Sequence, residues 1–151
     1  MNWFLDFLRN KYLITVLVAF FTSQTIKVFT HAITYKKWDF KRIFGDGGMP
    51  SSHTATVTSF AFITGMTHGF ASFAFGISML LCLIVCRDAV GVRNETGKQS
   101  IILNELKHLL EGKDVTKIKL KEFVGHTPVQ VFCGAILGFI VALVMELVVF
   151  A

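Results

Sequence analysis

The sequence has few charged residues and few prolines. Only 17% of its 151 residues are Asp, Glu, Lys or Arg, and there are two prolines. A soluble globular chain carries about 25% charged residues, whereas 53% of this chain is hydrophobic and its mean hydropathy is +0.60. This composition excludes a disordered chain, which needs low hydrophobicity. It is typical of a membrane protein, and its length predicts a single membrane-embedded domain over residues 1–151.

Cysteine is also scarce, and its pattern excludes two common roles. Cys82, Cys86 and Cys133 are odd in number, and all three lie inside apolar runs. Neither a disulfide framework nor a zinc site has this pattern. We expect ordinary buried thiols.

Acidic residues are outnumbered, which gives a formal net charge of +5. In a soluble chain this excess would suggest a nucleic-acid partner. In a strongly apolar chain, basic residues are instead typical of cytoplasmic loops. We therefore predict no nucleic-acid partner.

Four apolar runs approach the roughly 20 residues that a membrane-spanning helix needs. They cover residues 12–29, 54–66, 70–85 and 129–150. The second run is short for a full span, so it must extend into residues 51–53 or be partly covered by protein. The sequence therefore predicts an all-α, polytopic membrane helical bundle of about four transmembrane helices.

The basic residues predict how this bundle is oriented. Thirteen of the fifteen lysines and arginines fall in or beside the two long loops, which share one face if there are four spans. The positive-inside rule places both long basic loops in the cytoplasm of a multi-pass cell-membrane protein. Within the second loop, apolar spacing over residues 99–111 predicts a short amphipathic helix, with Gly97 before it and Gly112 after it.

A glycine-rich loop over residues 45–53 delivers Pro50, Ser51, Ser52 and His53 into the second run. Proline favours the first turn of a helix and serine caps it. The N–H groups and the positive dipole at a helix start attract anions. The Pro-Ser pair alone would suit an ordinary helix start, but His53 would lie beside any oxyanion bound there.

A second junction repeats this arrangement, because Gly125, His126 and Pro128 lead into the fourth run. The span count puts both junctions on one membrane face. One histidine of such a pair can attack phosphorus while the other protonates the departing oxygen. Either histidine by itself would more commonly be structural.

Positively charged side chains near these junctions could hold phosphoryl oxygens. Lys27 lies in a polar stripe with Ser23 and His31 on the first run, although it could simply extend to the membrane interface. Arg93 and Asp88 follow the third run. Asp88 could pair with an arginine, orient a histidine, or form a plain interfacial salt bridge.

Several segments together resemble a known superfamily. Residues 49–53 (Met-Pro-Ser-Ser-His), followed by a second histidine before a later span, resemble the type-2 phosphatidic acid phosphatases and haloperoxidases. Residues 88–93, 97–99, 103–105 and 125–128 are similar to its small, divergent bacterial and plant branch. This resemblance covers most of the chain, from Lys27 to Gly138.

The resemblance implies roles for the site residues. His126 matches the phosphohistidine-forming nucleophile and His53 the leaving-group acid. Lys27, Ser51, Ser52 and Arg93 are implied to bind phosphate, and Asp88, Gln130 and Lys121 to support them. The superfamily chemistry needs no metal or other cofactor, and its substrate here would be a lipid phosphate or pyrophosphate.

The sequence departs from the superfamily pattern at four places. Thr34 and Tyr35 stand where an Arg-Pro pair is expected, and Ser52 replaces a glycine. Leu120 replaces an arginine six residues before the nucleophile, so Arg93, Lys119 or Lys121 would have to substitute. Gln130 replaces the aspartate that orients the nucleophile. These departures leave open a non-catalytic protein that binds a phospholipid or phosphate ligand, or a purely structural bundle.

Small residues four apart predict close helix packing. Gly65 and Gly69 form one such pair, and Gly134 and Gly138 form another. Patterns of this kind let helices approach closely in membranes. We considered a homodimer through one of these faces. Glu146, deep in the fourth run, would be costly unless it is paired.

Overall fold

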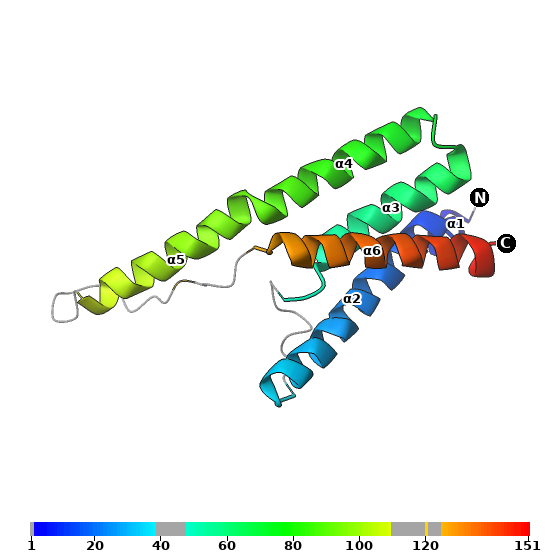
Figure 1. Cartoon of the computed structure of the whole chain (residues 1–151). Helices are drawn as coiled ribbons and strands as arrows, with labels where there is room; N and C mark the ends of the chain where they lie inside the picture. The colour runs from blue at the N-terminus through cyan, green and yellow to red at the C-terminus, as the bar shows by residue number, and fades with distance from the viewer. Residues whose placement is uncertain (1, 39–47, 110–119, 121–124) are drawn as a thin grey trace.

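The computed structural model describes residues 2–38, 48–109, 120 and 125–151. Within these ranges the chain is helical, and no strand is present. The elements in chain order are α1 (Trp3–Leu8), α2 (Lys11–Tyr35), α3 (Ser52–His68), α4 (Phe73–Val90), α5 (Val92–Leu109) and α6 (Pro128–Val144), which ends in a π-helical turn (Met145–Val149). The predicted all-α membrane bundle is confirmed (Figure 1).

Side-chain caps fix where the long helices begin. The side chains of Asn10, Ser51, Ser72 and Thr127 each accept a hydrogen bond from a first-turn N–H group, at the starts of α2, α3, α4 and α6. Such caps satisfy donors that have no partner within the helix. Pro128 occupies the first turn of α6, as predicted. Pro50 does not occupy the first turn of α3, because it precedes the cap residue Ser51.

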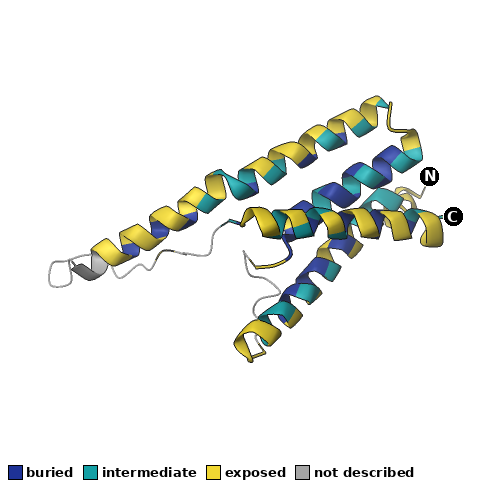
Figure 2. Ribbon diagram, viewed as in Figure 1, coloured by how far each residue is buried: buried dark blue, intermediate teal, exposed yellow. Residues whose placement is uncertain are grey.

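Three helical stretches among the described residues are long and apolar enough to cross a membrane: Lys11–Tyr35, Phe73–Leu106 and Pro128–Val149. The short second run becomes α3, which has 17 residues. It packs against α2, α4 and α6, so protein covers much of its surface. Figure 2 shows the buried residues concentrated on α3, while α4 and α6 present mostly exposed faces. The prediction of four spans is thus refined to three long helices around a short central one.

Close contact between α3 and α6 depends on glycine. A Cβ atom added at Gly134 would lie 2.5 Å from the carbonyl oxygen of Ser51, and one added at Gly138 would lie 2.4 Å from that of Ala55. Both glycines therefore face α3 of the same chain. On α3, Gly65 faces Phe70 and Phe75. Because these faces are covered within the chain, a homodimer would need another surface.

The predicted amphipathic helix begins earlier than expected. Helix α5 starts at Val92, continues almost directly from α4, and contains Gly97 as a buried residue. The predicted end near Gly112 lies outside the described residues. A stretch of 34 residues spans roughly 51 Å at 1.5 Å per residue, which exceeds a hydrocarbon core of about 30 Å. The α5 part therefore extends beyond the bundle, as Figure 1 shows.

The two ends of the bundle carry different polar groups. Both termini lie near the α3–α4 turn, where Lys11 Nζ forms an ion pair of 3.2 Å with Glu146. This ion pair offsets the cost of placing the half-buried Glu146 in the membrane-spanning helix. The starts of α3 and α6 lie at the opposite end of the bundle. All three cysteines are free thiols; Cys82 is buried as expected, whereas Cys86 and Cys133 are half-buried.

Candidate functional site

The first turns of α3 and α6 are joined directly. The backbone N–H of Ser51 donates to the carbonyl oxygen of Gln130 across 3.0 Å, and Gly134 packs on Ser51 from the next turn of α6. The two histidine-bearing junctions therefore lie at one end of the bundle, as the span count predicted.

This junction brings the two histidines together. The ring centroids of His53 and His126 are 6.1 Å apart, with the ring planes at 61°. His126 is 3% exposed, whereas His53 is exposed. A catalytic group acts over a heavy-atom distance of roughly 2.6–3.2 Å. One phosphoryl group can thus be reached by both rings.

The backbone of α4 and α5 holds His126 in place. The His126 N–H donates to the carbonyl oxygen of Ala89 across 3.1 Å. Gly125 has φ +106°, and a Cβ atom there would lie 2.4 Å from the Asn94 nitrogen and 2.7 Å from the Arg93 oxygen. Only glycine combines this backbone conformation with so close an approach. Gly125 therefore allows this junction to pack against the backbone at the start of α5, and His126 beside it supplies the imidazole.

The α6 cap sets the tautomer of His126. The Oε1 atom of Gln130 accepts from the Thr127 N–H at 3.1 Å and lies 3.2 Å from His126 Nδ1. A backbone N–H can only donate, so it fixes the amide oxygen toward itself and toward the imidazole. Nδ1 must then carry the proton, and Nε2 keeps the lone pair that a nucleophile needs. Gln130 orients the ring in the manner of the missing aspartate, but without its charge.

The surroundings of His126 favour its neutral form. Burial lowers the pKa of the imidazole below its ordinary value, and the positive charges of Lys27, His53 and Arg93 act in the same direction. The hydrogen bond to Gln130 opposes this shift. A neutral imidazole near pH 7 suits a nucleophile.

Lys27 lies inside the bundle and does not extend to the membrane interface. It is 4% exposed, and its Nζ donates to Ser52 Oγ across 3.1 Å. Ser23, on the same stripe, is fully buried, whereas His31 stacks on Tyr35 at a half-buried position. The inward-facing stripe is therefore confirmed for its first two residues.

The two serines are engaged within the protein. Ser51 Oγ caps α3 and accepts from the Thr54 hydroxyl at 3.0 Å, and Ser52 Oγ accepts from Lys27. Both side chains are buried. Their contacts therefore fix the start of α3 and hold Lys27 against it.

Arg93 and Asp88 form an ion pair and line a pocket together with His53. The pocket has a volume of about 230 Å³, and Val85 and Ala89 contribute its apolar wall. Of the alternatives left open for Asp88, the structure shows pairing with an arginine. The guanidinium of Arg93 is half exposed at the pocket edge.

Leu120, at the position where the superfamily pattern has an arginine, has a structural role. The side-chain amide of Asn104, on α5, donates to the Leu120 carbonyl oxygen at 3.0 Å and accepts from the Leu120 N–H at 3.1 Å. These two hydrogen bonds tie Leu120 to α5. Lys119 and Lys121 lie outside the described residues.

Sequence reasoning included Asn104 and Gly125 only as parts of the family-like segments 103–105 and 125–128, and it predicted the structural contacts of neither residue. The glycine could have been found, because a Gly-His-Thr-Pro junction demands an unusual backbone. The buried Asn104 gave no such signal, because its partner is a backbone group distant in sequence. Among the described residues, no cluster of three His, Cys, Asp or Glu side chains suited to a metal ion occurs.

Fold and site together define an all-helical membrane protein with a paired-histidine centre at one end of its bundle. Residues 8–141 match the model of the Divergent PAP2 family, and the chain belongs to this family. It is 35% identical over 153 residues to the uncharacterized membrane protein YuiD of Bacillus subtilis (strain 168), with 93% of this chain and 97% of that protein covered. No solved structure matches the chain.

Proposed function

We propose that this protein hydrolyses a lipid phosphate or pyrophosphate in the membrane, through a phosphohistidine intermediate and without a metal. The observation that carries the proposal is the pair of histidine rings 6.1 Å apart. One ring is buried and fixed in its nucleophilic tautomer, and the other is exposed at a helix start. Family membership supports this chemistry without establishing it.

In the proposed reaction, Nε2 of His126 attacks phosphorus and forms an N–P bond. The P–O bond to the lipid breaks, and His53 gives its proton to the departing oxygen. Water then attacks the phosphorus of the phosphohistidine and gives a proton to His53, and the N–P bond to His126 breaks. Inorganic phosphate leaves, and both imidazoles return to their starting states.

Three groups would hold the phosphoryl oxygens during this transfer. Lys27 supplies charge from inside the bundle, Arg93 from the pocket edge, and the first turn of α3 supplies backbone donors. Ser51 and Ser52 keep the helix start and the lysine in place. Lys121 remains a candidate on sequence grounds alone.

The test is phosphate release by the purified protein in detergent with EDTA present. We expect wild-type turnover on a panel of lipid phosphates and pyrophosphates, loss of turnover in His126→Ala, and a strong decrease in His53→Ala. His68→Ala is the matched control, because His68 bonds to Tyr12 at the other end of the bundle. Equal inertness of wild type and His126→Ala across the panel would count against an enzyme.

The competing function is a membrane protein that binds a phospholipid or phosphate ligand at the same site without turnover. Gln130 and Leu120, where the superfamily has charged residues, favour it. This competing function predicts that wild type and His126→Ala both bind a phosphate analogue such as vanadate. Neither protein should release phosphate.

We also propose that the site faces the cytoplasm, because most basic residues fall in or beside the two long loops that lead into its helix starts. A Lys98→Cys variant in a cysteine-free background tests this, since Lys98 is exposed on α5. Reaction with a membrane-impermeant thiol reagent only after the cells are opened is the expected result. Labelling of intact cells would place the site outside.

A further inference from the structure

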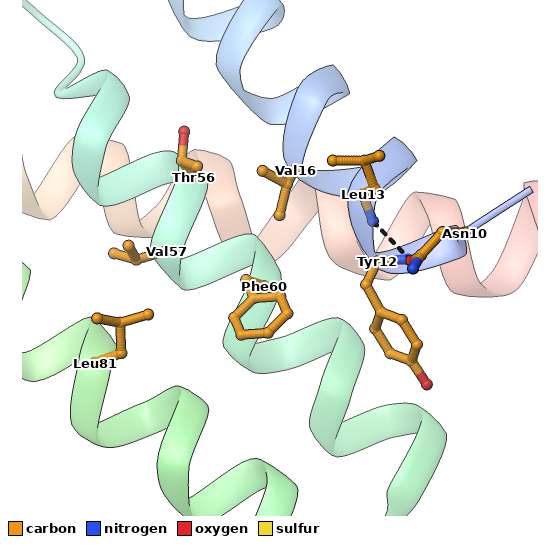
Figure 3. A pocket seen from close by; sticks show the side chains of 8 residues that line it. All are labelled: Asn10, Tyr12, Leu13, Val16, Thr56, Val57, Phe60 and Leu81. Atoms are coloured by element: carbon orange, nitrogen blue, oxygen red, sulfur yellow. Dashed lines mark hydrogen bonds between the residues drawn. The ribbon is translucent and has the colours of Figure 1, made fainter. Parts of the chain in front are cut away.

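An apolar groove of about 390 Å³ lies between α2, α3 and α4 (Figure 3). Val16 of α2, Val57 and Phe60 of α3, and Leu81 of α4 surround it. These side chains are half-buried or exposed, so the groove is open along one side. Nothing in the phosphate chemistry above uses it.

The groove continues from the histidine pocket along the same helix faces. On α3, His53 lines the pocket, and Val57 and Phe60, four and seven residues later, line the groove. On α4, Val85 lines the pocket, and Leu81, four residues earlier, lines the groove. Residues spaced by three, four or seven share one face of a helix. The histidine pocket and the apolar groove therefore follow each other along one side of the α3–α4 pair.

We propose that this groove binds the hydrocarbon chain of the lipid whose phosphate lies at the histidine pair. The inference rests on the proposed function and adds where the rest of the substrate lies. A phosphate next to His53 places the first carbons of its chain against the apolar wall at Val85. The groove is the apolar surface that follows next along the same face of α3 and α4.

The dimensions of the groove predict a dependence on chain length. Seven residues of α3 separate His53 from Phe60, which corresponds to roughly 10 Å. An extended chain advances roughly 1.2 Å per bond, so about nine bonds are needed to reach Phe60. At the far end, the groove is bounded by Asn10 and Tyr12, whose hydroxyl lies 2.6 Å from His68 Nε2. A butyl chain stays near the pocket, whereas a dodecyl chain fills the groove.

The experiment narrows the groove from its exposed wall. Leu81 is 45% exposed, so Leu81→Trp adds bulk into the groove with little disturbance of the core. Leu83→Trp is the matched control, because Leu83 is 61% exposed on the same helix and does not line the groove. The measurement is kcat/KM of the full-length protein in detergent for n-dodecyl phosphate and n-butyl phosphate.

We expect Leu81→Trp to lower the dodecyl-to-butyl ratio of kcat/KM by about tenfold or more, because each buried CH₂ contributes about a fourfold factor. Leu83→Trp should leave that ratio unchanged. An unchanged ratio in Leu81→Trp, or equal decreases in both variants, would overturn the proposal.

A binding readout separates this inference from the proposed function. A dodecyl phosphate with a diazirine at mid-chain should crosslink wild type and His126→Ala within residues 56–60 and at Leu81. Labelling should decrease in Leu81→Trp. If this pattern appears although no protein releases phosphate, the chain-binding proposal is supported and the proposed hydrolysis is refuted. Crosslinks confined to other helices refute the groove even if hydrolysis is observed.

Discussion

Replacing Gln130 by glutamate should restore the charge that the family pattern supplies next to the nucleophile. Gln130 Oε1 lies 3.2 Å from His126 Nδ1. Two opposite charges about 4 Å apart interact by about 1 kcal/mol in bulk water and about 4 kcal/mol at an effective dielectric constant of 20. Glutamate also suits the capping box that Thr127 and Gln130 already form, so the start of α6 should be preserved.

We expect Gln130→Glu to raise the pKa of His126, because the new carboxylate stabilises the protonated imidazole. The stabilisation should lie toward the lower end of the range of about 1–4 kcal/mol, because residue 130 is half-buried and water screens the pair. The wild-type pKa lies below the ordinary value of 6.5, so the variant should titrate nearer to neutral pH. NMR titration of histidine-labelled protein in micelles measures both values.

Gln130→Leu is the matched variant. It removes the hydrogen bond that raises the pKa of His126, so that pKa should fall further below the ordinary value. If His126 titrates at the same pH in wild type and Gln130→Glu, the assigned contact between the two side chains is wrong. If the proposed chemistry holds, kcat at pH 8 should increase about tenfold in Gln130→Glu, because a carboxylate stabilises the positive charge that forms on the attacking imidazole.

Three further predictions follow from the site. Gly125→Ala should destabilise the fold by about 3 kcal/mol or more, since it adds a backbone clash to an unfavourable φ. Thermal unfolding should show a smaller loss of stability in Gly69→Ala, because Gly69 also has a positive φ but an added Cβ there meets open space. Lys27→Met should raise the pKa of His126 toward its ordinary value, because the ammonium charge lowers it; an unmoved acid limb in the pH–rate profile would contradict this. In wild type, the lowered pKa of His126 means that the unfolded chain binds the proton more readily than the folded one. The stability present above pH 6.5 should therefore decrease as the pH falls below that value, and His126→Gln should flatten this slope in denaturant titrations.

Much of the fold could be predicted because lipid restricts the choice of structure. A chain with these apolar runs must satisfy its backbone hydrogen bonds internally, so helices are the outcome. Cap residues such as Ser51 and Thr127 then mark helix starts to within a residue or two. The start of α5 was missed because Gly97 was interpreted as a helix breaker, whereas the structure buries this glycine within the helix.

The sequence could nominate candidate site residues but not the contacts between them. Histidine and glycine at two helix starts carry a chemical signal that spacing alone reveals. The hydrogen bond from Lys27 to Ser52 and the two hydrogen bonds between Asn104 and Leu120 depend on how the segments pack. Packing couples residues that are far apart in the chain, so a single sequence cannot specify it.

By itself, the sequence determined a helical membrane protein with basic residues gathered near two histidine-bearing helix starts, because composition and local capping act over a few residues. Only the tertiary structure decided that α3 is the core of the bundle, that Gly134 and Gly138 face it instead of a second chain, and that the two imidazoles lie 6.1 Å apart. The physical reason is close packing. The contact of α6 with α3 across two glycines fixes the distance between the helix starts, and with it the distance between the histidines.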